Sequence, residues 1–197
     1  IMIQLKIPIT LASASPRRSQ LLQQIGVNFQ VYPPEIDEPC MENVEKTPDS
    51  IAMNLATAKA KNVATKVSDS LIIGADTVVS QNNILLGKPL DEQHAFDILS
   101  TLSGHKHIVT TGVALLHQGL FQLRTFFEET LVCFRNLTEE EIHRYIATGE
   151  PMDKAGAYGI QGFGALLIQR IEGDYNNVVG FPLTRFYQEL HHFSDKK

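Results

Sequence analysis

The sequence predicts an α/β fold in one domain, and three observations support this. Short apolar runs typical of strands alternate with segments that carry helix-start signals. The chain has 197 residues, of which 43% are hydrophobic, enough for one ordinary domain or for two small lobes that share a core. No repeat, low-complexity tract or long charge run marks a second domain. We therefore treat residues 1–197 as a single domain.

The first half of the chain predicts two strands and two helices. Ser15-Pro16 and Thr47-Pro48 each place an N-cap residue before a proline, a combination that starts many helices. Gly26 is a typical stop signal for the first helix. One face of the second helix is expected to collect Ile51, Leu55, Ala58 and Asn62. The expected elements are a strand at 9–12, a helix from 16, a strand at 29–32, an acidic loop at 33–47 and a helix from 48 to about 67.

The second half predicts a hairpin, a long antiparallel ribbon and three more helices. Apolar runs at 71–74 and 77–79 indicate a strand, with Asp76 between them and 84–86 as the hairpin partner. The helices are expected to start at Asp91, at the capping box Thr138 to Glu141 and at Pro182, the first two ending at Gly104 and Gly149. The remaining strands are expected at 108–116, 120–134 and 165–171, the first two joined through Gln118-Gly119.

Composition excludes several classes of partner. The net charge is -5 and the pI is near 5.8, so the surface as a whole should repel a nucleic-acid backbone, and any phosphate must bind in a local pocket. The apolar runs are far shorter than the roughly 18 residues that cross a bilayer, so no membrane partner is expected. The apolar stretch at the start is also too short for a secretory signal. We therefore expect a cytoplasmic protein.

Cysteine and histidine spacing predicts no metal centre. Cys40 and Cys133 lack CxxC spacing and are expected to be free thiols. The pairs His105/His107 and His191/His192 lack the spacing of a zinc enzyme and are expected to be surface or packing residues. Nothing in the context of either cysteine favours a covalent nucleophile.

Two cations stand in the first turn of the first predicted helix. Arg17 and Arg18 follow Ser15-Pro16, where the positive end of the helix dipole disfavours each by a few tenths to about 1 kcal/mol. A phosphate would offset that cost, because free N–H groups, the dipole and the guanidinium groups all attract its oxygens. The alternative is a pair of solvated surface arginines.

Asp76 and Lys88 are two further candidates. Asp76 lies between apolar runs, which requires it to be paired, metal-bound or directed to a cleft, unless it only caps a turn. Lys88, in Gly87-Lys88-Pro89, lies near rigid backbone, but the motif is no P-loop and could be a simple turn.

Two glycine-containing stretches, 153–162 and 173–182, lie between apolar elements. The first packs three glycines and two alanines around one amide side chain, Gln161. That composition lets backbone approach a ligand closely, and the alternative is a flexible surface loop. For the second stretch, chemistry alone assigns no role.

Five motifs in this order and spacing resemble the Maf family over nearly the whole chain. They are the segments 11–18, 74–77, 87–89, 102–104 and 150–162. The resemblance implies an elongated, twisted mixed sheet with flanking helices and two lobes around a cleft, related to the inosine-triphosphate pyrophosphatases. It also implies a nucleoside-triphosphate pyrophosphatase that needs Mg²⁺ or Mn²⁺ and releases a nucleoside monophosphate and pyrophosphate.

Carried over position by position, the resemblance implies roles for nine residues. Phosphate binding is implied for Ser13, Arg18, Lys59 and Lys88, base preference for Arg17, Thr77 and Gln161, metal binding for Glu38 and Asp76, and proton acceptance for Asp76. A carboxylate beside cations is a weak base at neutral pH. We therefore expect the metal to supply much of the activation of the attacking water.

Arg17 and Gln161 resemble the family members that favour dTTP and UTP. Members that favour 7-methyl-GTP carry an aromatic residue where Arg17 stands, so a pyrimidine nucleoside triphosphate is the expected substrate. The alternative is a regulator of cell division that binds nucleotide in the same pocket without catalysis. The sequence leaves open whether the chain forms a homodimer.

Overall fold

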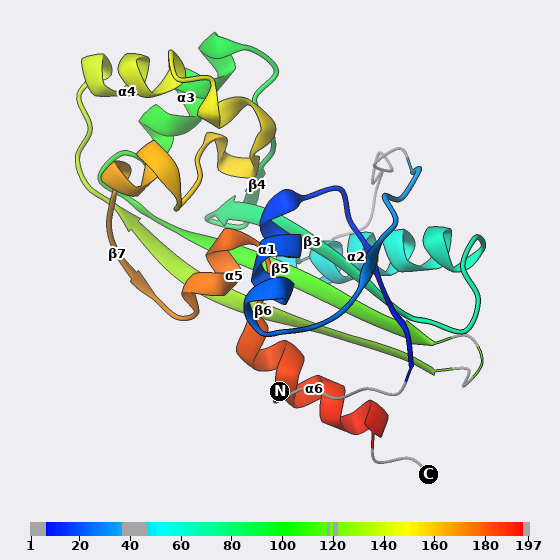
Figure 1. Ribbon diagram of the computed structural model, residues 1–197. Helices are drawn as coiled ribbons and strands as arrows, with labels where there is room; N and C mark the ends of the chain where they lie inside the picture. The colour runs from blue at the N-terminus through cyan, green and yellow to red at the C-terminus, as the bar shows by residue number, and fades with distance from the viewer. Residues whose placement is uncertain (1–6, 37–46, 118, 120–121, 195–197) are drawn as a thin grey trace.

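One mixed sheet runs through the computed structural model (Figure 1). The structure describes residues 7–36, 47–117, 119 and 122–194, and for residues 192–194 it describes the backbone alone. Its strands follow the order β2-β1-β3-β5-β6-β7, and β4 pairs with the far end of β3. β1 pairs in parallel with β2 and β3, and the other pairs are antiparallel. The strands are β1 (Ile9–Ala12), β2 (Gln30–Val31), β3 (Leu71–Gln81), β4 (Ile84–Leu86), β5 (Lys106–His117), β6 (Gln122–Phe134) and β7 (Ile168–Glu172). The predicted α/β class, hairpin and ribbon are confirmed.

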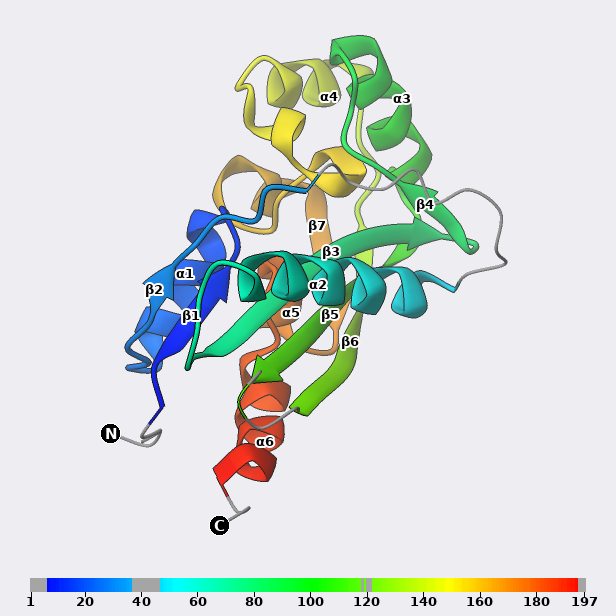
Figure 2. The same cartoon turned by 90° about the vertical axis from the view of Figure 1, so that its right-hand side faces the viewer.

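Helices cover both faces of the sheet and one of its ends. α2 lies along one face, as Figure 2 shows, while α1, α5 and α6 pack on the other. α3, α4 and three short 3-10 helices form a second lobe at the end where β4 lies (Figure 1). The helices are α1 (Pro16–Gln24), α2 (Pro48–Ala64), α3 (Glu92–Leu102), α4 (Glu139–Ile146), η1 (Glu150–Asp153), η2 (Ala155–Ala157), η3 (Gly162–Leu167), α5 (Tyr175–Val179) and α6 (Leu183–Ser194).

Helix starts follow the predicted signals. The Asp91 side chain accepts the backbone N–H of His94 at the start of α3. Thr138 and Glu141 form the predicted capping box of α4. Gly26 and Gly104, the predicted stop residues, both adopt positive φ, the conformation that glycine adopts at little cost.

α2 packs unusually close to the sheet because small residues meet there. A Cβ added to Gly74 would lie 2.1 Å from the carbonyl oxygen of Ala56, and one added to Gly112 would lie 2.3 Å from the carbonyl carbon of Ala52. Of the four residues predicted to share one face of this helix, Leu55 is buried, whereas Ile51, Ala58 and Asn62 are half-buried. The face that is buried consists of Ala52, Leu55, Ala56, Ala60, Val63 and Ala64, since two glycines on the strands admit a face of alanines.

Three predicted boundaries also need correction. The strand expected at 165–171 begins only at Ile168, because residues 162–167 form η3, whose carbonyls at 166 and 167 accept hydrogen bonds from Arg135. The strand expected at 29–32 has two residues, and the helix expected to reach about 67 ends at Ala64. Among the described helices, none is long and apolar enough to cross a membrane.

Candidate active site

A cavity of about 810 Å³ opens where the sheet is interrupted between the two lobes. β1 pairs with β3 as far as Gly74, and β4 begins to pair at Val79. In the part of the chain that the structure describes, residues 75–78 therefore have no strand partner on that edge of β3. Asp76 and Thr77 lie in this gap and line the cavity.

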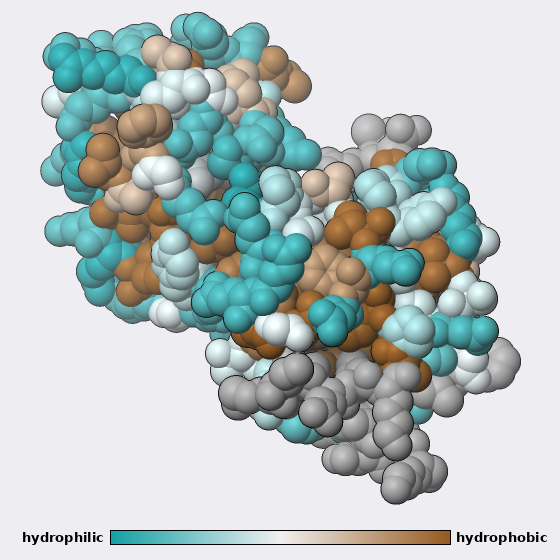
Figure 3. All heavy atoms as spheres, in the orientation of Figure 1, coloured by the Kyte–Doolittle hydropathy of each residue, from teal (hydrophilic) through white to brown (hydrophobic). Residues whose placement is uncertain are grey.

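The wall of the cavity is more positive than the protein as a whole. Among the described residues, the charged side chains that line it are five cationic and three acidic ones, namely Arg17, Arg18, Lys59, Lys88 and Lys154 with Asp76, Glu150 and Asp153, although the chain carries a net charge of -5. In the space-filling view, a notch lies between the two lobes (Figure 3). A local positive excess in a concave site predicts an anionic ligand.

Arg18 is buried and held from three directions. Its Nε donates to the Gly180 carbonyl at 2.9 Å, Nη1 to Ser13 Oγ at 3.2 Å and Nη2 to Thr77 Oγ1 at 3.1 Å. Burial lowers the pKa of the guanidinium, an effect that Asp76 opposes and Arg17 adds to. The group nevertheless stays charged, because an arginine pKa lies so far above neutrality. Two of its five N–H donors have no acceptor within the described ranges and are left for a ligand.

The start of α1 faces the same cavity. Ser15 precedes the helix as predicted, but its hydroxyl makes no capping hydrogen bond. Its backbone N–H donates instead to Ser13 Oγ at 3.2 Å. Ser15, Pro16 and Arg17 all line the cavity, so the positive end of the helix dipole is directed at any anion bound there.

Asp76 forms a buried ion pair with Lys59. Lys59 Nζ donates to Asp76 Oδ1, and the two side chains are only 14% and 12% exposed. The pair follows from the close approach of α2, since Gly74 and Asp76 lie two residues apart on the same face of β3. Among the described residues, Asp76 Oδ2 has no hydrogen-bond partner. This oxygen is thus the acceptor that Asp76 offers to a ligand.

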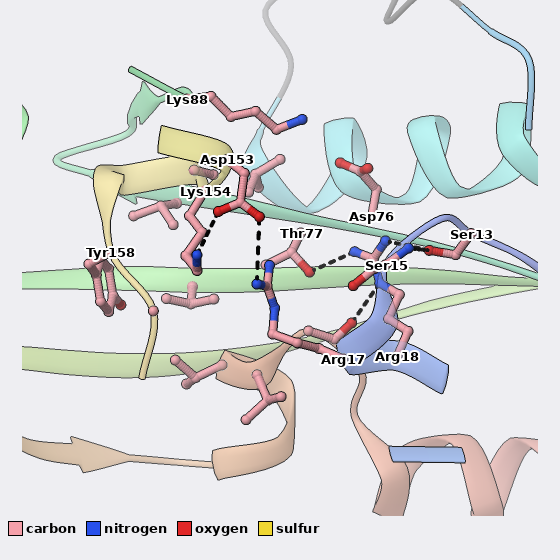
Figure 4. Close-up of a pocket in the computed structure, with 18 of the residues that line it drawn as sticks. Ser13, Ser15, Arg17, Arg18, Asp76, Thr77, Lys88, Asp153, Lys154 and Tyr158 are labelled. Carbon is pink, nitrogen blue, oxygen red and sulfur yellow. Dashed lines mark hydrogen bonds and ion pairs between the residues drawn. The ribbon is translucent and has the colours of Figure 1, made fainter. Parts of the chain in front are cut away.

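Lys88 reaches the cavity from the opposite lobe. It follows β4 and extends toward the side where Asp76 lies (Figure 4). The preceding residue, Gly87, accepts the backbone N–H of Gly156 through its carbonyl at 3.1 Å. Lys88 is therefore carried on a backbone joined to the 3-10 segment of the second lobe.

Arg17 meets an acidic residue of the second lobe across the cavity. Its Nη1 lies 3.9 Å from Asp153 Oδ2, and Lys154 Nζ donates to Asp153 Oδ1 at 2.5 Å (Figure 4). Although partial burial raises the pKa of Asp153, the hydrogen bond from Lys154 and the charges of Lys154 and Arg17 together hold it below its ordinary value. Asp153 is therefore ionised at neutral pH and accepts hydrogen bonds only.

The structure brings together every predicted site residue that it describes. The residues lining the cavity include Ser13, Arg17, Arg18, Lys59, Asp76, Thr77, Lys88 and Gln161. Glu38 lies outside the described residues. Sequence reasoning did not single out Glu150, Asp153 or Lys154, because it took their stretch as backbone that approaches a ligand. The sequence signal that could have indicated Asp153 and Lys154 is that these two charged residues precede three glycines.

The donor set can be tested against a divalent metal. No group of three or more histidine, cysteine, aspartate or glutamate side chains in the described ranges could hold a metal ion by itself. Mg²⁺, however, is usually bound through one or two carboxylates together with substrate phosphates. Asp76 Oδ2, which has no partner in the part of the chain that the structure describes and lies beside a cation-lined cavity, fits that second kind of site.

Comparison with known proteins identifies the family. The sequence profile described as "Maf-like protein" matches residues 8–193. The chain belongs to this family. The Maf-like chain is 52% identical to the dTTP/UTP pyrophosphatase of Halalkalibacterium halodurans over 191 residues, which cover 96% of this chain and 98% of the relative. It is 50% identical to the protein of that name from Carboxydothermus hydrogenoformans over 182 residues, covering 92% and 96%.

A solved structure shares the fold. The Ham1 protein of Staphylococcus aureus superposes with a TM-score of 0.52 at 12% identity, covering 94% of the Maf-like chain and 99% of its own. At that identity, the likeness concerns the fold alone. It confirms the predicted mixed sheet with flanking helices.

Proposed function

We propose that this Maf-like protein hydrolyses dTTP and UTP to the nucleoside monophosphate and pyrophosphate. The observation that carries the proposal is the convergence of Arg18, Lys59 and Lys88 on Asp76 in one cavity. Relatives that are about half identical over nearly their full length bear the name dTTP/UTP pyrophosphatase. The volume, about 810 Å³, is within the range typical of small-molecule sites.

In the proposed complex, the triphosphate lies between the two lobes. Arg18 and the start of α1 bind its oxygens from one side and Lys88 from the other. Each charge-assisted contact contributes on the order of 1.5–3 kcal/mol. A few such contacts are enough for micromolar affinity after the entropy of binding is subtracted.

The reaction is an attack of water on the α phosphorus. A bond forms from the water oxygen to that phosphorus, the bond to the bridging oxygen of the β phosphate breaks, and pyrophosphate leaves with the electron pair. Asp76 Oδ2 orients the water and accepts its proton, while Lys59 keeps the carboxylate in place. Arg18 and Lys88 stabilise the charge that develops on the phosphate oxygens.

We propose Asp76 as the described residue that holds Mg²⁺ or Mn²⁺ together with the phosphates. When bound, the ion would neutralise phosphate charge and lower the pKa of its water. Full activity after treatment with EDTA would contradict this part of the proposal.

The test is a nucleotide panel. Pyrophosphate release, coupled to inorganic pyrophosphatase, is measured for dTTP, UTP, CTP, ATP and GTP with Mg²⁺ and with Mn²⁺. We expect dTTP and UTP to react fastest and to yield the monophosphate. A regulator without catalysis would bind dTTP and release nothing.

A further inference from the structure

We infer that Glu150 is a positioning residue for Gln161, and that it helps the enzyme to distinguish uracil and thymine from other bases. The inference rests on the proposed function, because it concerns which nucleotide the same cavity selects. The observation behind the inference is separate from those that support the proposed function: the cap of a 3-10 helix is supplied by a residue distant from it in sequence.

Glu150 caps the 3-10 helix that follows Gln161. Gln161 is the N-cap residue of η3, the position whose side chain normally accepts the N–H of the second or third helical residue. Here its side chain makes no capping bond. Glu150 accepts those two N–H groups instead, from Phe163 through Oε2 at 3.0 Å and from Gly164 through Oε1 at 3.0 Å.

Tyr145 holds the chain on the other side of Gln161. The buried Tyr145 hydroxyl donates to Glu150 Oε1 at 2.9 Å and accepts the N–H of Gly159 at 3.2 Å. The backbone is therefore fixed two residues before Gln161 and again two and three residues after it. We call residues 159–164, with these contacts, the Gln161 loop.

The Gln161 loop closes tightly around the Tyr145–Glu150 pair. A Cβ added to Gly162 would lie 2.6 Å from Glu150 Oε2, and one added to Gly164 would lie 2.1 Å from the Gly159 carbonyl oxygen. Gly162 also adopts a φ of +67°, which disfavours other residues. Gly162 and Gly164 are thus required by the close packing of the loop against Glu150 and Tyr145.

The consequence is a glutamine side chain whose amide is available to a ligand. Gln161 is exposed and lines the cavity, and among the described residues its amide has no hydrogen-bond partner. The amide of glutamine offers one hydrogen-bond acceptor and one donor group. Uracil and thymine present a carbonyl acceptor beside an N–H donor, whereas cytosine presents an amino donor and a ring-nitrogen acceptor at the same two positions. Since such recognition depends on placement within about 0.5 Å, the pair that fixes the loop contributes to the choice of base.

The test is a double-mutant cycle read out as selectivity. The ratio of kcat/KM for UTP to that for CTP is measured in the wild type, Glu150→Gln, Gln161→Ala and the double variant. In Glu150→Gln, an NH₂ group of similar size replaces one carboxylate oxygen. Because this group is a donor, it cannot accept the backbone N–H that the oxygen accepted. We expect each single variant to lower the ratio about tenfold, mainly through KM for UTP, and the double variant to be no less selective than Gln161→Ala.

Glu141→Gln is the matched control. Glu141 Oε2 also accepts a backbone N–H, that of Thr138 at 2.9 Å, but it does so at the start of α4 and does not line the cavity. This variant should keep the wild-type ratio. If Glu150→Gln fails to fold, Tyr145→Phe replaces it in the cycle, because it removes the hydroxyl that joins Gly159 to Glu150.

Two outcomes would overturn the inference. The first is a double variant whose ratio falls by the product of the two single losses. The second is a fall of the ratio in Glu141→Gln that equals the fall in Glu150→Gln. Failure of the proposed function looks different, because the wild type would then release no pyrophosphate from any nucleotide. In that case the same proteins are compared by the ratio of Kd for UTP and CTP, which tests the positioning role directly.

Discussion

The two sides of the cavity carry their functional groups on different kinds of backbone. Arg18, Lys59 and Asp76 stand on α1, α2 and β3, where regular hydrogen bonding fixes each Cα. Asp153 and Gln161 stand on or beside 3-10 turns of the second lobe, which side chains such as Glu150 hold in place. We call the first the phosphate side and the second the base side. Lys88, which follows β4 and reaches the triphosphate from the second lobe, is counted with the phosphate side.

The comparison teaches what each side can do for selectivity. All nucleoside triphosphates share the triphosphate, so a change on the phosphate side should lower activity toward every nucleotide by a similar factor. The bases differ, so a change on the base side should alter ratios between nucleotides. The predictions below test this division, starting with the largest expected effect.

Asp76→Asn should lower kcat for dTTP, UTP and CTP by about 100-fold or more, the usual contribution of a positioned proton acceptor. The amide can still accept from Lys59, but it offers no negative charge to a metal or a proton. Steady-state kinetics at saturating metal provides the measurement. Asp153→Asn is the matched change on the base side and should cost less than about tenfold for UTP while altering the UTP to CTP ratio. Equal losses in both variants would erase the distinction between the sides.

Gly74→Ala should destabilise the protein by about 3 kcal/mol, a large cost for overpacking. The new Cβ would lie 2.1 Å from the carbonyl oxygen of Ala56, so α2 must move away and take Lys59 from Asp76. Urea unfolding measures the loss of stability, and activity should fall alike for all nucleotides. Gly87→Ala is the control, because nothing lies within 4 Å of its added Cβ. Unchanged stability in Gly74→Ala would show that α2 does not depend on this glycine.

The phosphate side was largely predictable from sequence because its signals are local. Ser15-Pro16 set the start of α1, and an isolated aspartate among apolar residues marked Asp76. The packing face of α2 was not predictable, since periodicity favours the larger side chains. The face that packs is chosen by Gly74 and Gly112, which lie outside the helix, on β3 and β5.

The base side was less predictable because its structure depends on contacts over distance. The stretch 153–162 was expected to lie near a ligand, and Gln161 does line the cavity. The roles of Glu150 and Asp153 were not foreseen. A carboxylate that caps a turn more than ten residues away follows no spacing rule, so only the folded backbone reveals it.

His107 should make the stability of the base side sensitive to acid. It is 2% exposed, its Nε2 lies 2.7 Å from the hydroxyl of Tyr158, and burial lowers its pKa from 6.5 to about 4. The unfolded chain therefore binds the proton first, so stability is fully present above pH 6.5 and is lost as the pH falls toward 4. Between pH 7 and 5 this group should cost about 2 kcal/mol.

Urea unfolding of the wild type and of His107→Phe at both pH values isolates this contribution. Phenylalanine fills the aromatic cluster with Phe134 and Tyr158 but does not titrate. The variant is expected to be less stable at pH 7, where Tyr158 has lost its partner, and to approach the wild type at pH 5. Parallel stability curves for the two proteins would contradict the assignment.

Arg17→Trp should have the smallest effect and gives the sharpest test of the division, because Arg17 lies on α1 but faces Asp153 of the base side. If position on the backbone decided its role, activity toward all nucleotides would fall together. If the contact with Asp153 decides the role of Arg17, the ratio of kcat/KM for UTP to that for 7-methyl-GTP should fall about tenfold, or about 1.4 kcal/mol. The Tm should stay close to that of the wild type. We expect the second result, since Arg18 and Lys88 still bind the phosphates, and Arg17→Lys, which keeps the charge, should retain most of the ratio. A uniform loss in both variants would place Arg17 with the phosphate residues.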